Sequence, residues 1–175
     1  MAGMVRMRRS VGVGSGILLV LLGLWGGLIA FIGPYFHYAY TPDTTWTYNT
    51  ARLWLEILPG AAAFLGGLLL IATSSKHVAG FGAMLAAAAG AWFALGTVLS
   101  PLWNNNVQLG GSPASTTVVM RIAEQLGIFT GLGVVIVCVA AFAFGRVVSV
   151  PAETESVEPL DAPSATETMP IQPLG

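Results

Sequence analysis

Two pairs of oppositely charged residues are the best candidates for chemistry in this sequence. Arg52 and Glu56 are four residues apart, and Arg121 and Glu124 are three residues apart. Either spacing places both side chains of a pair on one face of a helix. A carboxylate in such a position can bind a proton or a cation. Glu56 and Glu124 are therefore the candidate titrating groups of a binding site, or of an ion or proton path.

The same four residues also have a structural interpretation, which the sequence favours. The arginines can extend their side chains to lipid headgroups while the glutamates neutralise them, and such a pair can hold two helices together. No other motif competes with them, because His37 and His77 have no second His, Cys or acid at metal-ligand spacing. No serine has a plausible His and Asp partner, so we expect no catalytic residue, no metal and no cofactor.

The composition indicates which elements must position these charges. Of the 175 residues, 55% are hydrophobic and 9% are charged, whereas a soluble domain carries roughly 25% charged residues. A soluble chain this apolar could not cover its own surface, so the expected class is a membrane protein. A span needs about 20 apolar residues, which leaves room for four spans but not for a separate catalytic domain. The net charge of −1 argues against nucleic acid as a partner.

Four apolar runs predict four transmembrane helices, at about 15–33, 53–73, 81–99 and 122–145. The other predicted segments are a basic N-terminus (1–14), outer loops (34–52 and 100–120), a short inner turn and a tail (149–175). Pro59 falls in the first turns of the second helix, where it either kinks that helix or marks its start.

Basic residues predict the orientation of these helices. With the N-terminus inside, most of the Lys and Arg side chains lie on the inner side: Arg6, Arg8, Arg9, Lys76 and Arg146. This excess predicts that both ends of the chain are cytoplasmic. Lysine is rare while alanine, glycine and valine are abundant, which is typical of a GC-rich bacterial genome and indicates a plasma (inner) membrane.

The first outer loop and the tail differ in composition. The loop at 34–52 holds all four tyrosines, and aromatic rings with a polar edge favour the headgroup zone. We expect this loop to lie along the membrane or to fold over the helix ends. The tail at 149–175 is acidic and rich in proline, without an aromatic residue. It cannot bury enough apolar area to offset the entropy of ordering, so we expect it to be disordered.

An internal repeat relates the two halves of the chain. The Gly-x-Trp motifs that end at Trp25 and Trp92 lie 67 residues apart, and each is followed by a proline after eight intervening residues. Two glycines of the second helix recur 67 residues further on in the fourth. We predict two tandem parallel two-helix repeats, 15–74 and 75–148. The two charge pairs would then face each other across the bundle as a ring of four charges.

Two small-residue motifs predict close helix packing. Gly23 and Gly27 lie on the first helix, and Gly127 and Gly131 lie on the fourth, each pair at a spacing of four. This spacing lets helix backbones approach closely, either within the bundle or between copies of the chain. We expect packing within the bundle, with Trp25 as a packing anchor.

The predicted architecture is an all-α membrane protein with four transmembrane helices in two tandem repeats. Its expected partners are the lipid bilayer and another membrane protein or a second copy of itself, and no nucleic acid. The favoured function is a non-enzymatic accessory or scaffold subunit of a membrane complex. The alternative is a small oligomeric transporter or channel that uses Glu56 and Glu124 at the outer membrane face.

Overall fold

The structure of the chain is all-helical, as its apolar runs predict. The computed structural model describes residues 10–38, 40, 46, 48, 50–102 and 112–149. Within these residues, four helical segments are long and apolar enough to cross a membrane, which confirms an all-α protein with four candidate transmembrane spans. The basic residues before Ser10 and the predicted tail after Ser149 lie outside the described residues.

Several of the spans consist of more than one helix. The first is α1 (Ser10–Ile32), and the second joins α2 (Thr50–Arg52), the π-helical turn η2 (Leu53–Ile57) and α3 (Leu58–Ala72). The third is α4 (Lys76–Leu99), and the fourth joins α5 (Val118–Ile128) and α6 (Thr130–Ser149). Two 3-10 helices follow the odd-numbered spans, η1 (Gly33–Phe36) and η3 (Ser100–Leu102).

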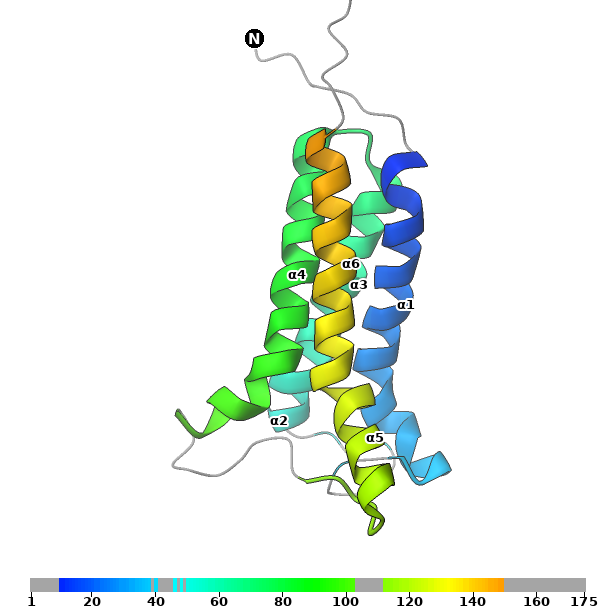
Figure 1. Ribbon diagram of the computed structural model, residues 1–175, viewed down its shortest axis with the longest axis vertical. Helices are drawn as coiled ribbons and strands as arrows, with labels where there is room; N and C mark the ends of the chain where they lie inside the picture. The colour runs from blue at the N-terminus through cyan, green and yellow to red at the C-terminus, as the bar shows by residue number, and fades with distance from the viewer. Residues whose placement is uncertain are drawn as a thin grey trace, which may run out of the picture.

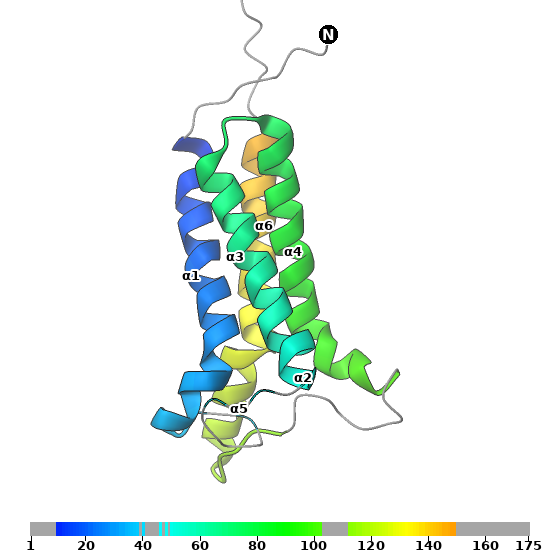
Figure 2. The same ribbon diagram turned by 180° about the vertical axis from the view of Figure 1, so that it is seen from behind.

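The spans form a four-helix bundle in which neighbours are antiparallel (Figure 1). α1 packs against α3 and α6, and α4 packs against the same two helices, as the view from behind also shows (Figure 2). Ser10, Ser149 and the turn at 73–75 lie together at one end, which we call the terminal end. The opposite end, where α1 and α4 end and α2 and α5 begin, we call the loop end.

The second span is irregular because a proline enters it. In η2 the N–H of Leu58 donates to the carbonyl of Leu53, five residues earlier. The next donor in this register would be Pro59, which has no N–H, so the carbonyl of Trp54 lacks its helical partner. The indole of Trp92 replaces that donor, with Nε1 at 2.8 Å from the Trp54 carbonyl oxygen. Pro59 itself lies in the first turn of α3 and so marks a helix start.

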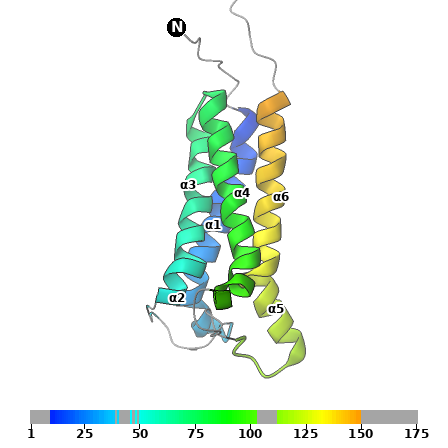
Figure 3. The same ribbon diagram turned by 90° about the vertical axis from the view of Figure 1, so that its left-hand side faces the viewer.

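The fourth span is also interrupted, which corrects the prediction of one continuous helix at 122–145. Phe129 separates α5 from α6 with φ −122° and ψ −84°, outside the helical region. Figure 3 shows α5 bending away from the direction of α6. The indole of Trp25 donates to the carbonyl of Gly127 just before the break, at 3.0 Å. Trp25 and Trp92 therefore act alike, since each supplies a donor to a carbonyl beside a helix irregularity.

Glycines bring α1 and α3 into backbone contact. A Cβ on Gly60 would lie 2.7 Å from the backbone nitrogen of Gly27, and a Cβ on Gly23 would lie 2.5 Å from that of Phe64. Real Cβ atoms do not approach this closely, so the contact requires the small residues that membrane helices use for close packing. Gly23 and Gly27 thus lie in the α1–α3 contact, beside Gly60 near the start of α3.

The α4–α6 contact repeats this arrangement. A Cβ on Gly133 would lie 2.6 Å from the backbone nitrogen of Ala94 and 2.5 Å from the carbonyl oxygen of Gly90. Gly90 corresponds to Gly23 at the predicted offset of 67. Gly133, however, makes the contacts in this pair that Gly60 makes in the first pair. The even-numbered spans therefore match at an offset of 73 and not 67. The two helix pairs therefore share one contact pattern, in a register that differs from the predicted one.

Candidate functional site

A group of polar side chains is enclosed at the loop end of the bundle. We call it the loop-end cluster, and it consists of Tyr38, Tyr40, Arg52, Glu56, Ser115 and Glu124. Arg52, Glu56 and Glu124 expose only 4%, 2% and 0% of their surface. Arg121, the fourth residue of the predicted charge ring, is exposed. The structure therefore buries three of the four predicted charges and leaves Arg121 outside the cluster.

Arg52 and Glu56 form one corner of the cluster. Glu56 lies on the π-helical turn η2, and the Arg52 guanidinium is within electrostatic range of its carboxylate. Cζ of Arg52 is also 6.0 Å from the centre of the Phe31 ring on α1, a cation–π distance. Oε2 of Glu56 is enclosed without a hydrogen-bond partner among the described residues. An enclosed carboxylate oxygen without a donor is costly, so this atom is suited to hold a proton or a small cation.

Glu124 forms the second corner and is fully satisfied by the connection that precedes α5. The Ser115 hydroxyl donates to Oε1 at 2.5 Å, and the Ser115 backbone N–H donates to Oε2 at 3.3 Å. Hydrogen bonds to an ionised group are stronger than neutral ones. These two bonds fasten the connection to the first turns of α5, so Glu124 acts as a structural latch.

Tyr38, which follows η1, reaches into the same corner. His37 adopts a left-handed conformation (φ 57°) and so turns the chain back after η1. The Tyr38 hydroxyl then donates to the carbonyl of Ala123 at 2.6 Å. Burial, and secondly the negative charge of Glu124, raise the pKa of Tyr38 above its usual value. The hydroxyl occupies the place that a Cβ on Gly127 would take, which explains a glycine there.

Tyr40 packs against the fourth span and the segment before α5. Its ring packs edge-on against Phe129, with ring centres 4.9 Å apart, and its backbone forms an isolated antiparallel bridge with Pro113. Burial raises the pKa of Tyr40 to about 12, and the charges of Glu124 and Glu56 add to the effect. Burial is the larger cause, so Tyr40 is a half-buried phenol that keeps its proton in the folded chain.

The sequence identified the charged members of the cluster but not their polar partners. Of the two predictions for the aromatic loop, folding over the helix ends describes Tyr38 and Tyr40. Several other aromatic side chains of this loop are exposed: Tyr35, Phe36, Trp46 and Tyr48. Nothing in the sequence marks Ser115 as a partner of Glu124, because Ser115 lies in a stretch of small and polar residues. Ser100, also fully buried at the loop end, donates to the carbonyl of Thr97 at 2.9 Å.

The two glycines predicted to pack the fourth helix have other neighbours. Gly127 contacts Tyr38 and accepts the Trp25 indole. A Cβ on Gly131 would lie 2.5 Å from the carbonyl oxygen of Leu126 in the same span. Both glycines therefore accommodate the helix break and the inserted loop, rather than a close approach of two helix backbones.

The loop-end cluster contains carboxylate, guanidinium, phenol and hydroxyl groups. In the described ranges no three His, Cys, Asp or Glu side chains gather as a metal site would require. What the cluster does offer is one enclosed carboxylate oxygen beside a guanidinium and a phenol. Comparison of the chain with family models, with curated proteins and with solved structures gives no match. The functional interpretation therefore rests on the geometry of the cluster and its position in the bundle.

Proposed function

We propose that this chain is a non-enzymatic accessory or scaffold subunit of a membrane complex. The distribution of polar groups carries the proposal. The buried charges lie at the loop end, and Ser15 is the buried polar residue described near the terminal end. Fully buried apolar side chains fill the bundle between them: Leu19, Ala63, Ala86, Phe93 and Ile136. A solute would find no polar route through this part of the chain, which favours a scaffold over a conducting path.

The outer surface supports the same proposal. The helices expose large apolar side chains along their length, which lipid or another membrane protein would cover. Exposed aromatic rings at the loop end favour the headgroup zone. The partners that we propose are the bilayer and another membrane protein or a second copy of the chain, and a net charge of −1 gives nucleic acid no attraction.

The proposed orientation places the terminal end in the cytoplasm and the loop end outside the plasma membrane. The excess of Lys and Arg at the terminal end supports it. Single cysteines introduced in the tail and in the loop at 35–50, in a Cys138→Ser background, test it with a membrane-impermeant maleimide. Intact cells should label the loop cysteine, and the tail cysteine only after permeabilisation. Labelling of both positions in intact cells contradicts the proposal.

We also propose that the bundle arose by tandem duplication of a two-helix unit, 15–74 and 75–148. The matched glycine contacts of the two helix pairs support this, and so does the shared role of Trp25 and Trp92. The two units would have diverged at their loop ends, since the even-numbered spans match at an offset of 73 and the odd-numbered ones at 67.

Purification of the tagged protein from its own cells in a mild detergent tests the accessory role, with mass spectrometry of what co-purifies. A membrane protein present at a near-equal molar amount supports it. A matched chain shortened after Ser149 should keep its helix content, and it shows whether the acidic tail contributes to the contact. Recovery of the chain alone contradicts the accessory role and favours transport.

The second candidate function is a small oligomeric transporter or channel that uses Glu56 and Glu124. One carboxylate oxygen of Glu56 has no hydrogen-bond partner among the described residues, which favours this candidate. Glu56 also lies on a π-helical turn, and such turns occur frequently at functional sites. Reconstitution in liposomes tests it by a pH-dependent ion flux. Glu56→Gln should abolish a flux that the carboxylate carries, while Arg121→Gln should leave it unchanged. Absence of flux in the wild type excludes this candidate.

A further inference from the structure

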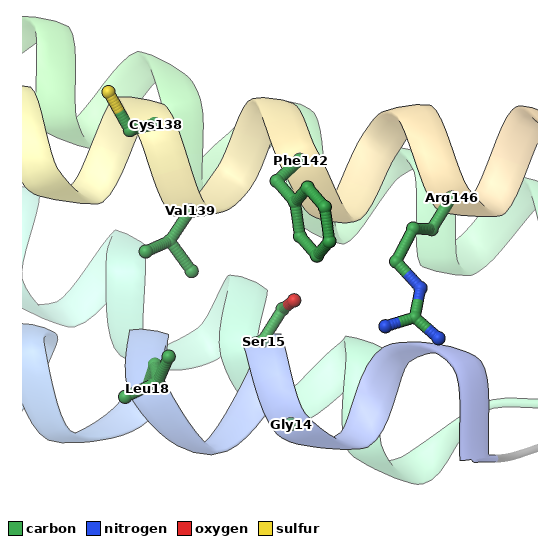
Figure 4. Close-up of a pocket in the computed structure, with 7 residues that line it drawn as sticks. All are labelled: Gly14, Ser15, Leu18, Cys138, Val139, Phe142 and Arg146. Carbon is green, nitrogen blue, oxygen red and sulfur yellow. The ribbon is translucent and has the colours of Figure 1, made fainter.

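The contact between α1 and α6 differs from the other three helix contacts of the bundle. Glycines bring α1 close to α3, α3 close to α4 and α4 close to α6, whereas two grooves open between α1 and α6. A groove of about 390 Å³ lies in this seam near the terminal end. Its walls are Gly14, Ser15 and Leu18 on α1, and Cys138, Val139, Phe142 and Arg146 on α6 (Figure 4).

The groove is polar at one end and apolar along the rest of its length. Arg146 reaches from α6 towards α1, and the Ser15 hydroxyl points into the space between the helices (Figure 4). Cζ of Arg146 lies 5.7 Å from the centre of the Phe142 ring, which holds the guanidinium over the groove. Leu18 and Val139 form the deeper walls. A ligand for this space needs an anionic head and an apolar body.

The depth of these residues matches the layers of one bilayer leaflet. Arg146 lies three residues before the end of α6, which is about 5 Å along the axis at the usual helical rise, so its charge reaches the headgroup zone. Val139 lies roughly 10 Å deeper by the same rise, within the roughly 15 Å that a leaflet contributes to the hydrocarbon core. The polar end thus faces headgroups and the apolar walls face acyl chains.

The apolar surface continues along the same seam. A second crevice of about 390 Å³ is lined by Leu22 and Trp25 on α1 and by Val135 on α6, among others. Leu22 follows Leu18 by four residues, and Val135 precedes Val139 by four, so each pair lies on one helix face. A chain that enters at Arg146 can therefore extend along α1 and α6 beyond the first groove.

The charged side chains described at the terminal end favour an anion. Among the described residues this end carries Lys76, His77 and Arg146 but no Asp or Glu, since both described glutamates lie at the loop end. Basic pockets between transmembrane helices bind the headgroups of anionic lipids. A helix from a second copy would cover the apolar walls, but the described part of the chain has no Asp or Glu at this end to place against Arg146.

We propose that the α1–α6 groove binds one anionic phospholipid. Its phosphate contacts the Arg146 guanidinium, the Ser15 hydroxyl donates to the glycerol-ester region, and one acyl chain lies along Leu18 and Val139. The site is independent of the loop-end cluster and of the accessory role proposed above. It makes the lipid part of the bundle, because the lipid fills the seam that the helices leave open.

Native mass spectrometry of the full-length protein in detergent tests the site, with phosphatidylglycerol and phosphatidylcholine of identical acyl chains as probes. Two variants change the groove. Arg146→Gln removes its positive charge, and Gly14→Leu fills part of its space. Each variant has a matched control. Arg121→Gln removes an exposed arginine away from the groove, and Gly145→Leu adds a leucine side chain outside the groove. A Cβ on Gly14 or Gly145 meets no atom within 4 Å, so both positions accept leucine, but only Gly14 lines the groove.

We expect one phosphatidylglycerol molecule to bind per chain. Its binding should need about fivefold less lipid than the binding of phosphatidylcholine, which is the difference that one basic contact with an anionic lipid provides. Arg146→Gln should remove this preference, and Gly14→Leu should lower retention of both lipids, while both controls behave as the wild type. An equal loss in Arg121→Gln, or no change in either groove variant, overturns the proposal. Displacement of the lipid by inorganic phosphate indicates a site for a free anion and overturns the proposal. A lipid-free dimer of the wild type that Gly14→Leu separates into monomers also overturns it.

Discussion

The two charge pairs of this chain have similar sequences and different surroundings. At the Arg52–Glu56 corner both side chains are buried, and one carboxylate oxygen has no hydrogen-bond partner among the described residues. At the other corner Arg121 is exposed, while Glu124 is fully buried and accepts two hydrogen bonds from Ser115. The first corner is a charge enclosed with its counter-ion, and the second is a latch between a loop and a helix.

This difference shows that residue type and spacing do not decide the role of an ion pair in a bundle. Glu56 lies on a π-helical turn that Pro59 imposes, against α1, where Arg52 also reaches the Phe31 ring. Glu124 lies on α5, which bends away from α6 at Phe129 and leaves Arg121 on an uncovered face. The local irregularity of each helix thus determines which charges the bundle encloses.

The largest expected effect is at the enclosed pair. Arg52→Gln should destabilise the bundle by about 3 kcal/mol, because it leaves the Glu56 carboxylate buried without its cation. The double variant Arg52→Gln/Glu56→Gln should recover most of that loss, because it removes both charges together. Unfolding in mixed detergent micelles of increasing dodecyl sulfate content measures the difference. Arg121→Gln is the matched control and should leave the midpoint unchanged, and an equal loss in the control would mean that the corners do not differ.

The latch should contribute somewhat less. Glu124→Ala should cost about 2 kcal/mol, since it leaves the Ser115 hydroxyl and backbone N–H without their acceptor. Ser115→Ala removes only the hydroxyl donor and should cost less than Glu124→Ala. The same detergent titration compares them. If Glu124→Ala and Ser115→Ala prove additive in the double variant, the two side chains do not act as one latch.

Titration of Tyr40 tests whether one phenol senses both corners. Its pKa of about 12 lies above the ordinary value of 10, so the folded state retains a proton that the unfolded chain releases. The stability contributed by this phenol is therefore present below pH 10 and is lost as the pH rises towards 12. The wild-type minus Tyr40→Phe difference in tyrosinate absorbance should titrate near pH 12. Glu124→Gln should lower that midpoint but keep it above 10, because burial is the larger cause. A midpoint of 10 in the wild type would contradict the enclosed position of the ring.

The smallest expected effects are at the two tryptophans, one beside each corner. Trp92→Phe leaves the Trp54 carbonyl without its donor, and Trp25→Phe does the same to Gly127. Each should cost about 1 kcal/mol, the usual net value of one hydrogen bond. Thermal melting in detergent measures both against Trp54→Phe as a control, because the Trp54 side chain is half exposed. A loss in only one of the two would show that the indoles do not serve the same purpose at the two irregular helices.

Much of the architecture was predictable because a membrane restricts what an apolar run can do. Each run of about 20 apolar residues must satisfy its backbone hydrogen bonds internally, so it forms a helix whatever its neighbours are. The irregular turn before α3 also has a visible cause, because Pro59 removes a donor at a known position. The break at Phe129 has no such mark, since glycines near it occur equally in regular helices of this chain.

The candidate site was likewise predictable from the sequence only in part. Composition and spacing determined four spans, the residues able to carry charge, and the small residues at the α1–α3 contact. Only the tertiary structure decided that Arg52 is enclosed and Arg121 is not, that Ser115 satisfies Glu124, and that Tyr40 packs against Phe129. These contacts join segments up to 85 residues apart, as from Tyr38 to Ala123. They depend on where each helix bends and how the loop folds back, which local sequence patterns do not specify.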